Sequence, residues 1–207
     1  LYIAQPPLYK VSRGKSEVYI KDQTGLEDYL IAQGIEGAVL RLPNGEEIAG
    51  NDLARVVEAA RSFKRILEAF PTHYPRHIVE QAAIAGAFDP GRADADLQRV
   101  ADEVAQRLDL VALEYERGWQ GRITQDHGIR LSRVLRGVEE IRTLDGAVLR
   151  SGEARKLSEV SRESRTVYVD PARLARKDRE QLIHGPTELL TAILDEGAKG
   201  QQIQRYK

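Results

Sequence analysis

The 207-residue chain contains no cysteine and no methionine, and it has a single tryptophan. Without cysteine it cannot form disulfides, thiolate metal sites or a cysteine nucleophile. No apolar run approaches the ~20 residues that a membrane-spanning helix needs, so we expect a cytoplasmic protein with no membrane partner. A translated gene starts with methionine and this chain starts with Leu1, so we expect it to be a piece of a larger protein. Its hydrophobic fraction of 42% is enough for a core.

The chain also lacks a net excess of charge, since its formal charge is −1, but its two halves differ. Residues 1–116 hold 13 basic and 19 acidic residues, a net charge of −6. Residues 117–207 hold 18 and 13, a net charge of +5, so only this half is suited to a polyanion. Arginine outnumbers lysine 23 to 8, which is typical either of a GC-rich genome or of phosphate contact.

Apolar periodicity predicts an α+β chain in which helices pack with an antiparallel β meander. Helices are expected over 26–32, 51–70, 75–85, 94–108, 153–165 and 186–198. The first of them should have Thr24 as N-cap and Gly34 as its stop. Strands are expected on both sides of Pro6-Pro7 and at 18–20, 38–42, 47–49, 166–169 and 202–206. The meander should contain four strands, at 110–115, 119–125, 129–135 and 138–144, and 173–180 should be a loop or a short helix.

Two pairs of residues come close to a metal-binding pattern, and neither completes one. His73 and His77 have the i, i+4 spacing of metal ligands on a helix, but Pro75 lies between them and no glutamate follows His73. Asp94 and Asp96 open a predicted helix, where acidic side chains cap free N–H groups. We therefore predict no catalytic residue and no metal site. Trp119 is expected to be a core anchor of the meander.

Two basic stretches lie in the second half of the chain. The first stands on adjacent meander strands, has Asp126 as its only acidic neighbour, and consists of Arg117, Arg122, Arg130, Arg133 and Arg136. The second is interleaved with Glu153, Glu159 and Glu163, which can pair with it along a helix. It consists of Arg150, Arg155, Lys156, Arg162 and Arg165. The first stretch is the better candidate for nucleic-acid contact, although exposed strand faces also carry arginine without such a function.

The two ends of the chain carry the most specific motifs. Tyr2-Ile-Ala-Gln-Pro-Pro-Leu-Tyr-Lys-Val11, followed by Gly14-Lys15 and Tyr19-Ile-Lys-Asp22, resembles a stretch of the B subunit of bacterial DNA gyrase. Gln202-Ile-Gln-Arg-Tyr-Lys207 resembles the start of a second motif of that family, which continues Gly-Leu-Gly-Glu-Met-Asn. The length of the stretch between the two motifs, 177 residues from Gln23 to Lys199, resembles that of the enlarged B subunits of Gram-negative bacteria, which carry a separate domain inserted into Toprim.

The resemblance implies a division of the chain into three segments. Residues 1–33 and 186–207 would be two segments of a partial Toprim α/β domain, and residues 34–185 would be the insert domain. In the family, the Mg²⁺-binding acidic motifs precede the segment that Leu1 matches, the ATP site belongs to an N-terminal domain, and the DNA-cleaving tyrosine belongs to the A subunit. We therefore expect no catalytic residue and no cofactor in this chain, whereas the whole enzyme would use ATP and Mg²⁺.

The resemblance also implies a function. Enzymes of this family are type IIA topoisomerases that use ATP to supercoil DNA negatively, so the implied partners are double-stranded DNA and the A subunit, in an A2B2 assembly. The insert is expected to be a non-catalytic accessory that aids DNA binding and enzyme assembly. The alternative is a protein-interaction scaffold that braces the A subunit without touching DNA.

Six basic residues are predicted to contact DNA. Three belong to the terminal motifs, beside the DNA path that the family implies: Lys10, Arg205 and Lys207. Three belong to the meander: Arg122, Arg130 and Arg133. In the alternative interpretation of the termini, Tyr9, Ile203 and Tyr206 pack the sheet while the basic residues are merely solvated.

Overall fold

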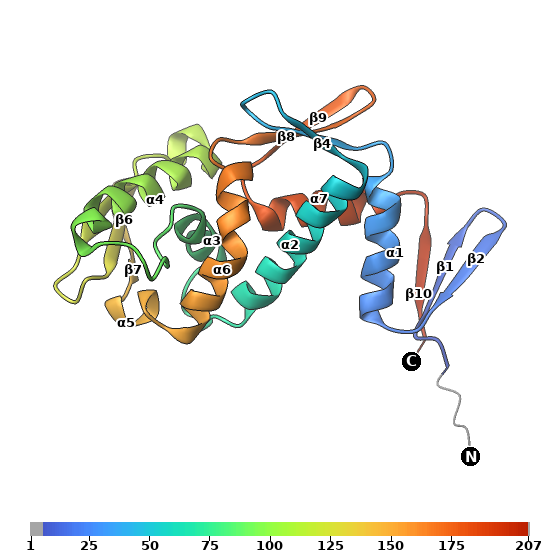
Figure 1. The fold of residues 1–207 in the computed structure, drawn as a ribbon, viewed down its shortest axis with the longest axis horizontal. Helices are drawn as coiled ribbons and strands as arrows, with labels where there is room; N and C mark the ends of the chain where they lie inside the picture. The colour runs from blue at the N-terminus through green and yellow to red at the C-terminus, as the bar shows by residue number, and fades with distance from the viewer. Residues whose placement is uncertain (1–5, 207) are drawn as a thin grey trace, which may run out of the picture.

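The chain forms an elongated molecule with a three-stranded sheet at each end and a four-stranded sheet between them (Figure 1). A computed structural model describes residues 6–206, except for the side chains of residues 163 and 164. Every strand pair in it is antiparallel, and helices join the sheets. The α+β class predicted from the sequence is confirmed.

The first of the end sheets, which we call the terminal sheet, combines both ends of the described chain. Its central strand β1 (Tyr9–Arg13) pairs with β2 (Ser16–Ile20) and with β10 (Gln202–Arg205). Helix α1 (Gln23–Ile35) covers one face, and a small core forms from Tyr9, Val11, Ile20, Leu26 and Leu30. The strands expected at 18–20 and 202–206 are confirmed, whereas the strand expected before Pro6 lies outside the described residues.

Helix α1 begins earlier than predicted. The carboxylate of Asp22 accepts a hydrogen bond from the N–H of Gly25 at 2.8 Å, so Asp22 is the N-cap and Thr24 lies inside the first turn. Both residue types cap helices well. The sequence pattern therefore allowed either start, and the hydrogen-bond geometry selected the earlier one.

Gly34 does not stop α1, contrary to the prediction. A Cβ at Gly34 would lie 2.1 Å from the carbonyl oxygen of Ile193 on α7 (Pro186–Ala198). A Cβ at Gly197 would lie 1.9 Å from the carbonyl oxygen of Leu30 on α1. These glycines are needed because the two helices cross with their backbones in close contact, and only a residue without a side chain fits there.

The central sheet has the strand order β4 (Glu47–Ala49), β3 (Val39–Arg41), β8 (Ala172–Arg176) and β9 (Arg179–Ile183). Helix α2 (Gly50–Glu68) and α7 pack against it and share a core that includes Leu40, Leu53, Val57, Leu174, Leu189 and Ile193. The hairpin predicted from 38–49 and the helices predicted over 51–70 and 186–198 are confirmed.

Two predictions near the central sheet were wrong. Residues 173–180, expected to be a loop or short helix, belong to the hairpin β8–β9. Their many charges are compatible with strands because Arg173 and Arg41 both pair with Glu180 across the sheet. The strand expected at 166–169 is instead the end of α6 (Gly152–Val167) followed by a bend, and Val167 and Tyr168 are buried in the same core. A short apolar run does not distinguish these two outcomes.

The far end of the molecule contains the largest core. Helices α3 (Arg76–Ile84), α4 (Leu97–Val111) and α6 pack with a meander of β5 (Gln120–Ile123), β6 (Ile129–Leu135) and β7 (Val138–Leu144), followed by the short helix α5 (Gly146–Leu149). Their core includes Phe63, Phe70, Phe88, Ile78, Leu108, Ile129, Leu131 and Leu157. Trp119, 7% exposed, is the predicted core anchor.

The meander has three strands and not the predicted four. Residues 110–115, expected to be its first strand, are the end of α4 and the start of the 3₁₀ helix η2 (Glu114–Glu116). Leu110, Val111, Leu113 and Tyr115 are all exposed, so this apolar run is not the buried face of a strand. Asp94 and Asp96 form a second 3₁₀ helix, η1 (Asp94–Asp96), and make no side-chain cap hydrogen bond to α4. The predicted capping is therefore wrong in detail, although both acids do precede the helix.

A buried polar junction joins the far end to α7. The carboxylate of Glu80 on α3 accepts hydrogen bonds from the N–H of Thr187 at 2.9 Å and from its hydroxyl at 2.6 Å. Arg107 on α4 donates to the Gln81 side chain at 3.0 Å and to the carbonyl of His184 at 3.4 Å. Glu80 thus caps α7 from another helix, since Gly185 at the N-cap has no side chain to do so. The domain limits at Gly34 and Gly185 stay a prediction.

Candidate nucleic-acid interface

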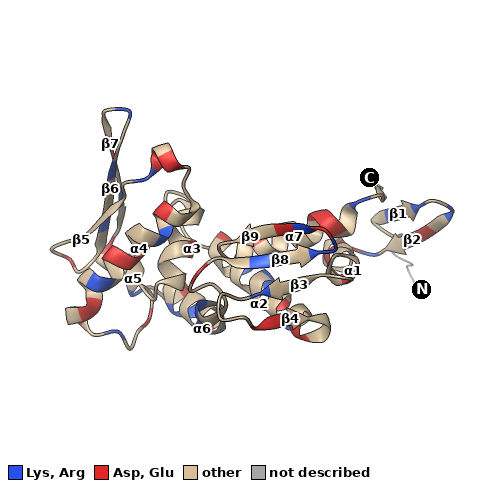
Figure 2. Cartoon of the chain, turned by 90° about the horizontal axis from the view of Figure 1, so that it is seen from above, with Lys and Arg blue, Asp and Glu red and all other residues tan. Residues whose placement is uncertain are grey.

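The strand register decides which meander arginines face solvent. Arg122 on β5 and Arg130 on β6 are direct cross-strand partners and both are exposed. Because side chains alternate along a strand, they lie on the face opposite the buried Gly121, Ile129 and Leu131, which pack towards α4. In Figure 2 the meander stands at one end of the molecule and carries basic positions along its strands. Two of the predicted DNA-contact residues therefore share one solvent face.

Arg133, the third predicted meander residue, lies on the opposite face. Its Nε donates to Glu140 at 2.8 Å, its Nη1 donates to the carbonyl of Glu116 at 2.6 Å, and its Cζ is 4.5 Å from the centroid of the Trp119 ring. The guanidinium therefore holds η2 and the indole against the meander. DNA contact by Arg133 stays a prediction, and these internal contacts compete with it.

The basic stretch has more acidic neighbours than Asp126. Arg130 is 3.7 Å from Glu139, and Glu140 pairs with both Arg133 and Arg142. The sequence interval between Arg117 and Arg136 contains only Asp126, but the hairpin brings the acids of β7 alongside. Within the described part of the chain, Arg117, Arg122 and Arg136 have no acidic partner. The solvent face of the meander is therefore positively charged at Arg122, and towards β7 it carries charges of both signs.

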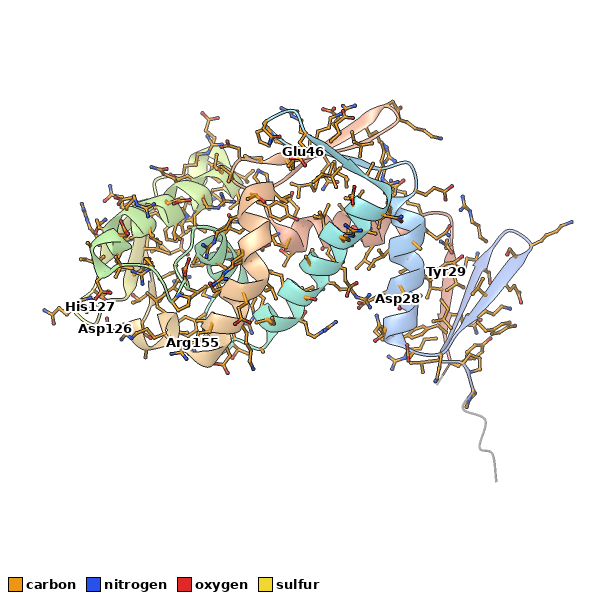
Figure 3. All side chains as sticks on the ribbon, viewed as in Figure 1. Asp28, Tyr29, Glu46, Asp126, His127 and Arg155 are labelled. Atoms are coloured by element: carbon orange, nitrogen blue, oxygen red, sulfur yellow. The ribbon has the colours of Figure 1, made fainter. Side chains whose placement is uncertain are left out.

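Asp126 and His127 form a structural turn between β5 and β6 (Figure 3). Asp126 accepts hydrogen bonds from the Thr124 hydroxyl and from the N–H of Gly146 at 2.9 Å, and these hydrogen bonds lower the pKa of its carboxyl. His127 has a φ of 58° and its Nδ1 is 3.9 Å from Asp94. These contacts fix the turn against the start of α5, and among the described residues no serine takes part.

The second basic stretch follows α6 and is largely exposed. Arg165 pairs with Asp89 at 3.1 Å, while Arg155, Lys156 and Arg162 are exposed. Among the side chains that the structure describes, none of these three forms the ion pairs with Glu153 or Glu159 that the spacing allowed. Arg155 lies near the same edge of the molecule as Asp126 (Figure 3). This stretch is thus a second exposed cationic surface. From the sequence, the meander was the better candidate of the two for nucleic-acid contact.

The terminal sheet separates its predicted DNA-contact residues. Lys10 is opposite Gln204, whereas Arg205 is opposite Tyr9, so Lys10 and Arg205 point to different faces. The Nζ of Lys10 is 2.6 Å from Glu17, whose hydrogen bond raises the pKa of the lysine. The Cζ of Arg205 is 6.0 Å from the ring centroid of Tyr9. Lys207 lies outside the described residues.

The histidine pair shows no metal-binding geometry. His73 stacks against Tyr74, with ring centroids 4.0 Å apart, and His77 belongs to α3. Desolvation, followed by the charge of Arg133, lowers the pKa of His77. Within residues 6–206, leaving aside the side chains of 163 and 164, no three His, Asp or Glu side chains are grouped as a metal site would require. No helix of this part of the chain is long and apolar enough to cross a membrane.

These features describe an α+β segment with an exposed basic strand face and no metal cluster in its described part. A family model described as "GyrB, hook" matches residues 7–35. The DNA gyrase B subunit of Caulobacter vibrioides (strain NA1000 / CB15N) is 40% identical over 209 residues, which cover 100% of this chain and 25% of that protein. The corresponding subunit of Rickettsia bellii is 30% identical over 207 residues, with coverages of 100% and 26%.

A third relative is similar to this chain over a shorter stretch. The DNA gyrase B subunit of Campylobacter jejuni is 40% identical over 68 residues, which cover 33% of this chain and 8% of that protein. The chain spans about a quarter of the length of the Caulobacter and Rickettsia proteins. From end to end it is similar to one segment of these DNA gyrase B subunits, and the resemblance predicted from the two terminal motifs is confirmed.

Proposed function

We propose that this chain is the non-catalytic part of a gyrase B subunit that contacts double-stranded DNA and supports assembly with the A subunit. The complete enzyme would be an A2B2 type IIA topoisomerase in the cytoplasm that supercoils DNA negatively, with ATP and Mg²⁺ bound outside this chain. The similarity over the whole chain supports the family, and the basic face of the meander supports the DNA contact. In this proposal residues 1–33 and 186–207 belong to Toprim and 34–185 form the insert.

The observation that carries the DNA contact is the cross-strand pair of Arg122 and Arg130. The Cβ atoms of such partners lie ~4.5–5.5 Å apart, and like charges directly opposite each other destabilise a sheet. Arg130 is partly offset by Glu139 at 3.7 Å, but Arg122 forms no ion pair with an acid among the described residues. A phosphate placed between the two guanidinium groups removes this repulsion, and the arginine fork suits phosphate oxygens.

Charge reversal of this pair tests the proposal. The variant with Arg122→Glu and Arg130→Glu should bind a 30-base-pair duplex more weakly than the unmodified chain in fluorescence anisotropy. The slope of log Kd against log salt should fall by about 1 for each phosphate that the variant no longer neutralises. Arg55→Glu is the matched control, because Arg55 is an exposed arginine on α2 in the acidic half of the chain. Equal affinity and equal salt slope in all three proteins would contradict the DNA contact.

A scaffold that braces the A subunit without DNA contact is the second candidate, and exposed apolar side chains favour it. Val134 and Val138 at the tip of the β6–β7 hairpin are 66% and 68% exposed, and Tyr115 on η2 is 66% exposed. Exposed apolar side chains at a hairpin tip are available for contact with another protein. If Val134→Ser with Val138→Ser weakened binding to the A subunit while the arginine variant left DNA binding intact, the scaffold would be the correct function.

A further inference from the structure

A cleft of about 540 Å³ lies where four segments meet, away from the meander. One wall comes from Arg13 at the end of β1, and another from the turn between β8 and β9. The remaining walls come from the C-terminal ends of α1 and α7. The cleft therefore joins the segment matched by the hook model, residues 7–35, to the central sheet.

Basic side chains dominate the lining of this cleft. Five of its residues are basic: Arg13, Arg176, Lys177, Arg179 and Lys199. Three are acidic: Glu36, Asp178 and Glu196. Glu196 is already engaged, because Lys199 approaches it to 2.8 Å and Arg179 to 3.3 Å. The ammonium group of Lys199 accordingly lowers the pKa of Glu196.

Arg13, Arg176 and Lys177 form no ion pair with any acid that the structure describes, although the charge of Arg176 also contributes to the lowered pKa of Glu196. They come from two different hairpins, so no helix spacing accounts for their meeting. Lys177 has a φ of 42°, in the left-handed region, which the two-residue turn between Arg176 and Arg179 requires. The turn thus places this lysine and Arg176 together at the cleft.

Arg176 has an incomplete set of hydrogen bonds. Its Nη1 donates to the carbonyl of Glu36, the C-cap of α1, at 3.0 Å. Its Nη2 is buried and has no acceptor within the described residues. The hydrogen bond of Nη1 is explained by the favourable interaction of a cation with a helix C-terminus. The same interaction does not explain Nη2, which has no acceptor although buried donors normally have one.

We propose that this cleft binds a phosphate group, held by Arg176 together with Arg13 and Lys177. Nη2 is closed to solvent in this structure, so the guanidinium of Arg176 has to turn towards the cleft before a phosphate oxygen supplies the acceptor that Nη2 lacks. The two other cations balance the charge of the anion. The group is either a phosphodiester of DNA or free inorganic phosphate, and only the DNA source rests on the proposed function. In both cases the bound anion connects the hook segment to the β8–β9 turn.

Titration of the full chain with inorganic phosphate, at constant ionic strength, tests the site. We expect saturable shifts of the arginine Nε–H signal of Arg176 and of the Lys177 amide in ¹⁵N NMR spectra. Combining Arg13→Gln with Lys177→Asn should raise the Kd about tenfold or more, and asparagine tolerates the left-handed backbone of position 177. Arg173→Gln is the control, since this exposed arginine on β8 pairs with Glu180 and is not part of the cleft lining.

A second titration, with a DNA duplex in place of inorganic phosphate, distinguishes the two sources of phosphate. If a 30-base-pair duplex shifts the same signals and free phosphate competes with it, the ligand is the DNA backbone. If only free phosphate shifts them, the ligand is the free anion, and the DNA contact at Arg122 and Arg130 is unaffected. If neither probe shifts them, or if the double variant binds phosphate as the control does, the proposal is overturned.

Discussion

The two end sheets have the same architecture but differ in how their basic residues are distributed over the two faces. Each has three antiparallel strands with helices on one face, and each carries cations predicted to contact DNA. In the meander, Arg122 and Arg130 are in register on the solvent face. In the terminal sheet, Lys10 and Arg205 lie on opposite faces. Basic residues on neighbouring strands form one surface only when the strand register places their side chains on the same face of the sheet.

The two ends also differ in how they are anchored. The meander packs on a large core shared with α3, α4 and α6, whereas the terminal sheet has a five-residue core under α1. The meander end is connected to α7 through buried Glu80, and α7 leads directly into β10. The junction therefore connects the meander end to the helix that leads to the terminal sheet.

The largest expected effect comes from the meander core. Leu131→Ala should cost about 2–5 kcal/mol of unfolding free energy, because Leu131 is fully buried and a cavity would remain. Val134→Ala on the same strand is the control, since Val134 is 66% exposed. Urea titration measures both variants, and hydrogen exchange should show reduced protection mainly in the meander. An equal reduction in the terminal sheet would show that the two ends are one cooperative unit.

Removal of the junction should have the next largest effect. Glu80→Ala leaves the N–H and hydroxyl of Thr187 without their acceptor and should cost about 1–3 kcal/mol. Glu80→Gln should recover part of this, since its amide oxygen can still accept from the backbone. If hydrogen exchange of the first turn of α7 were unchanged in Glu80→Ala, the coupling between the two ends would not depend on this residue.

The junction should also respond to pH. Burial raises the pKa of Glu80, so the folded state holds its proton more tightly than the unfolded state does. Stability should therefore fall as pH rises from about the unfolded value of 4.5 through the folded pKa. Thermal melts from pH 4 to 8 should show this decrease in the unmodified chain and a smaller decrease in Glu80→Gln. Parallel profiles for the two proteins would exclude Glu80 as the origin.

The smallest effect is expected in the terminal sheet and tests the comparison itself. Because Lys10 and Arg205 point to different faces, one DNA contact surface can engage only one of them. Lys10→Gln and Arg205→Gln each remove one positive charge. One of these variants should reduce the slope of log Kd against log salt for DNA binding by about 1, and the other should leave it unchanged. A reduction in both, adding up in the double variant, would mean that DNA contacts both faces of this sheet.

Local sequence patterns predicted the helices well. They did not predict the features that depend on contacts with residues distant in the sequence. The periods of α2, α4 and α7 are readable because one stripe of each helix faces a core. The hairpin β8–β9 was missed because its polar sequence is typical of a loop, whereas in the structure Glu180 pairs with Arg41 on another strand. For the candidate site, arginine positions were readable, but the internal contacts of Arg133 and the basic cleft around Arg176 were not.

Short-range periodicity and the contiguous motifs at the two ends were enough to predict the α+β class, most helices and the family. Three features came only from packing between distant segments. Arg122 and Arg130 share a face, Arg133 is engaged with Trp119 and Glu140, and Gly34 serves a helix crossing. No local pattern encodes these features, because strand register and close helix contact depend on residues far apart in the chain, and a register shift of one residue reverses every side chain of a strand.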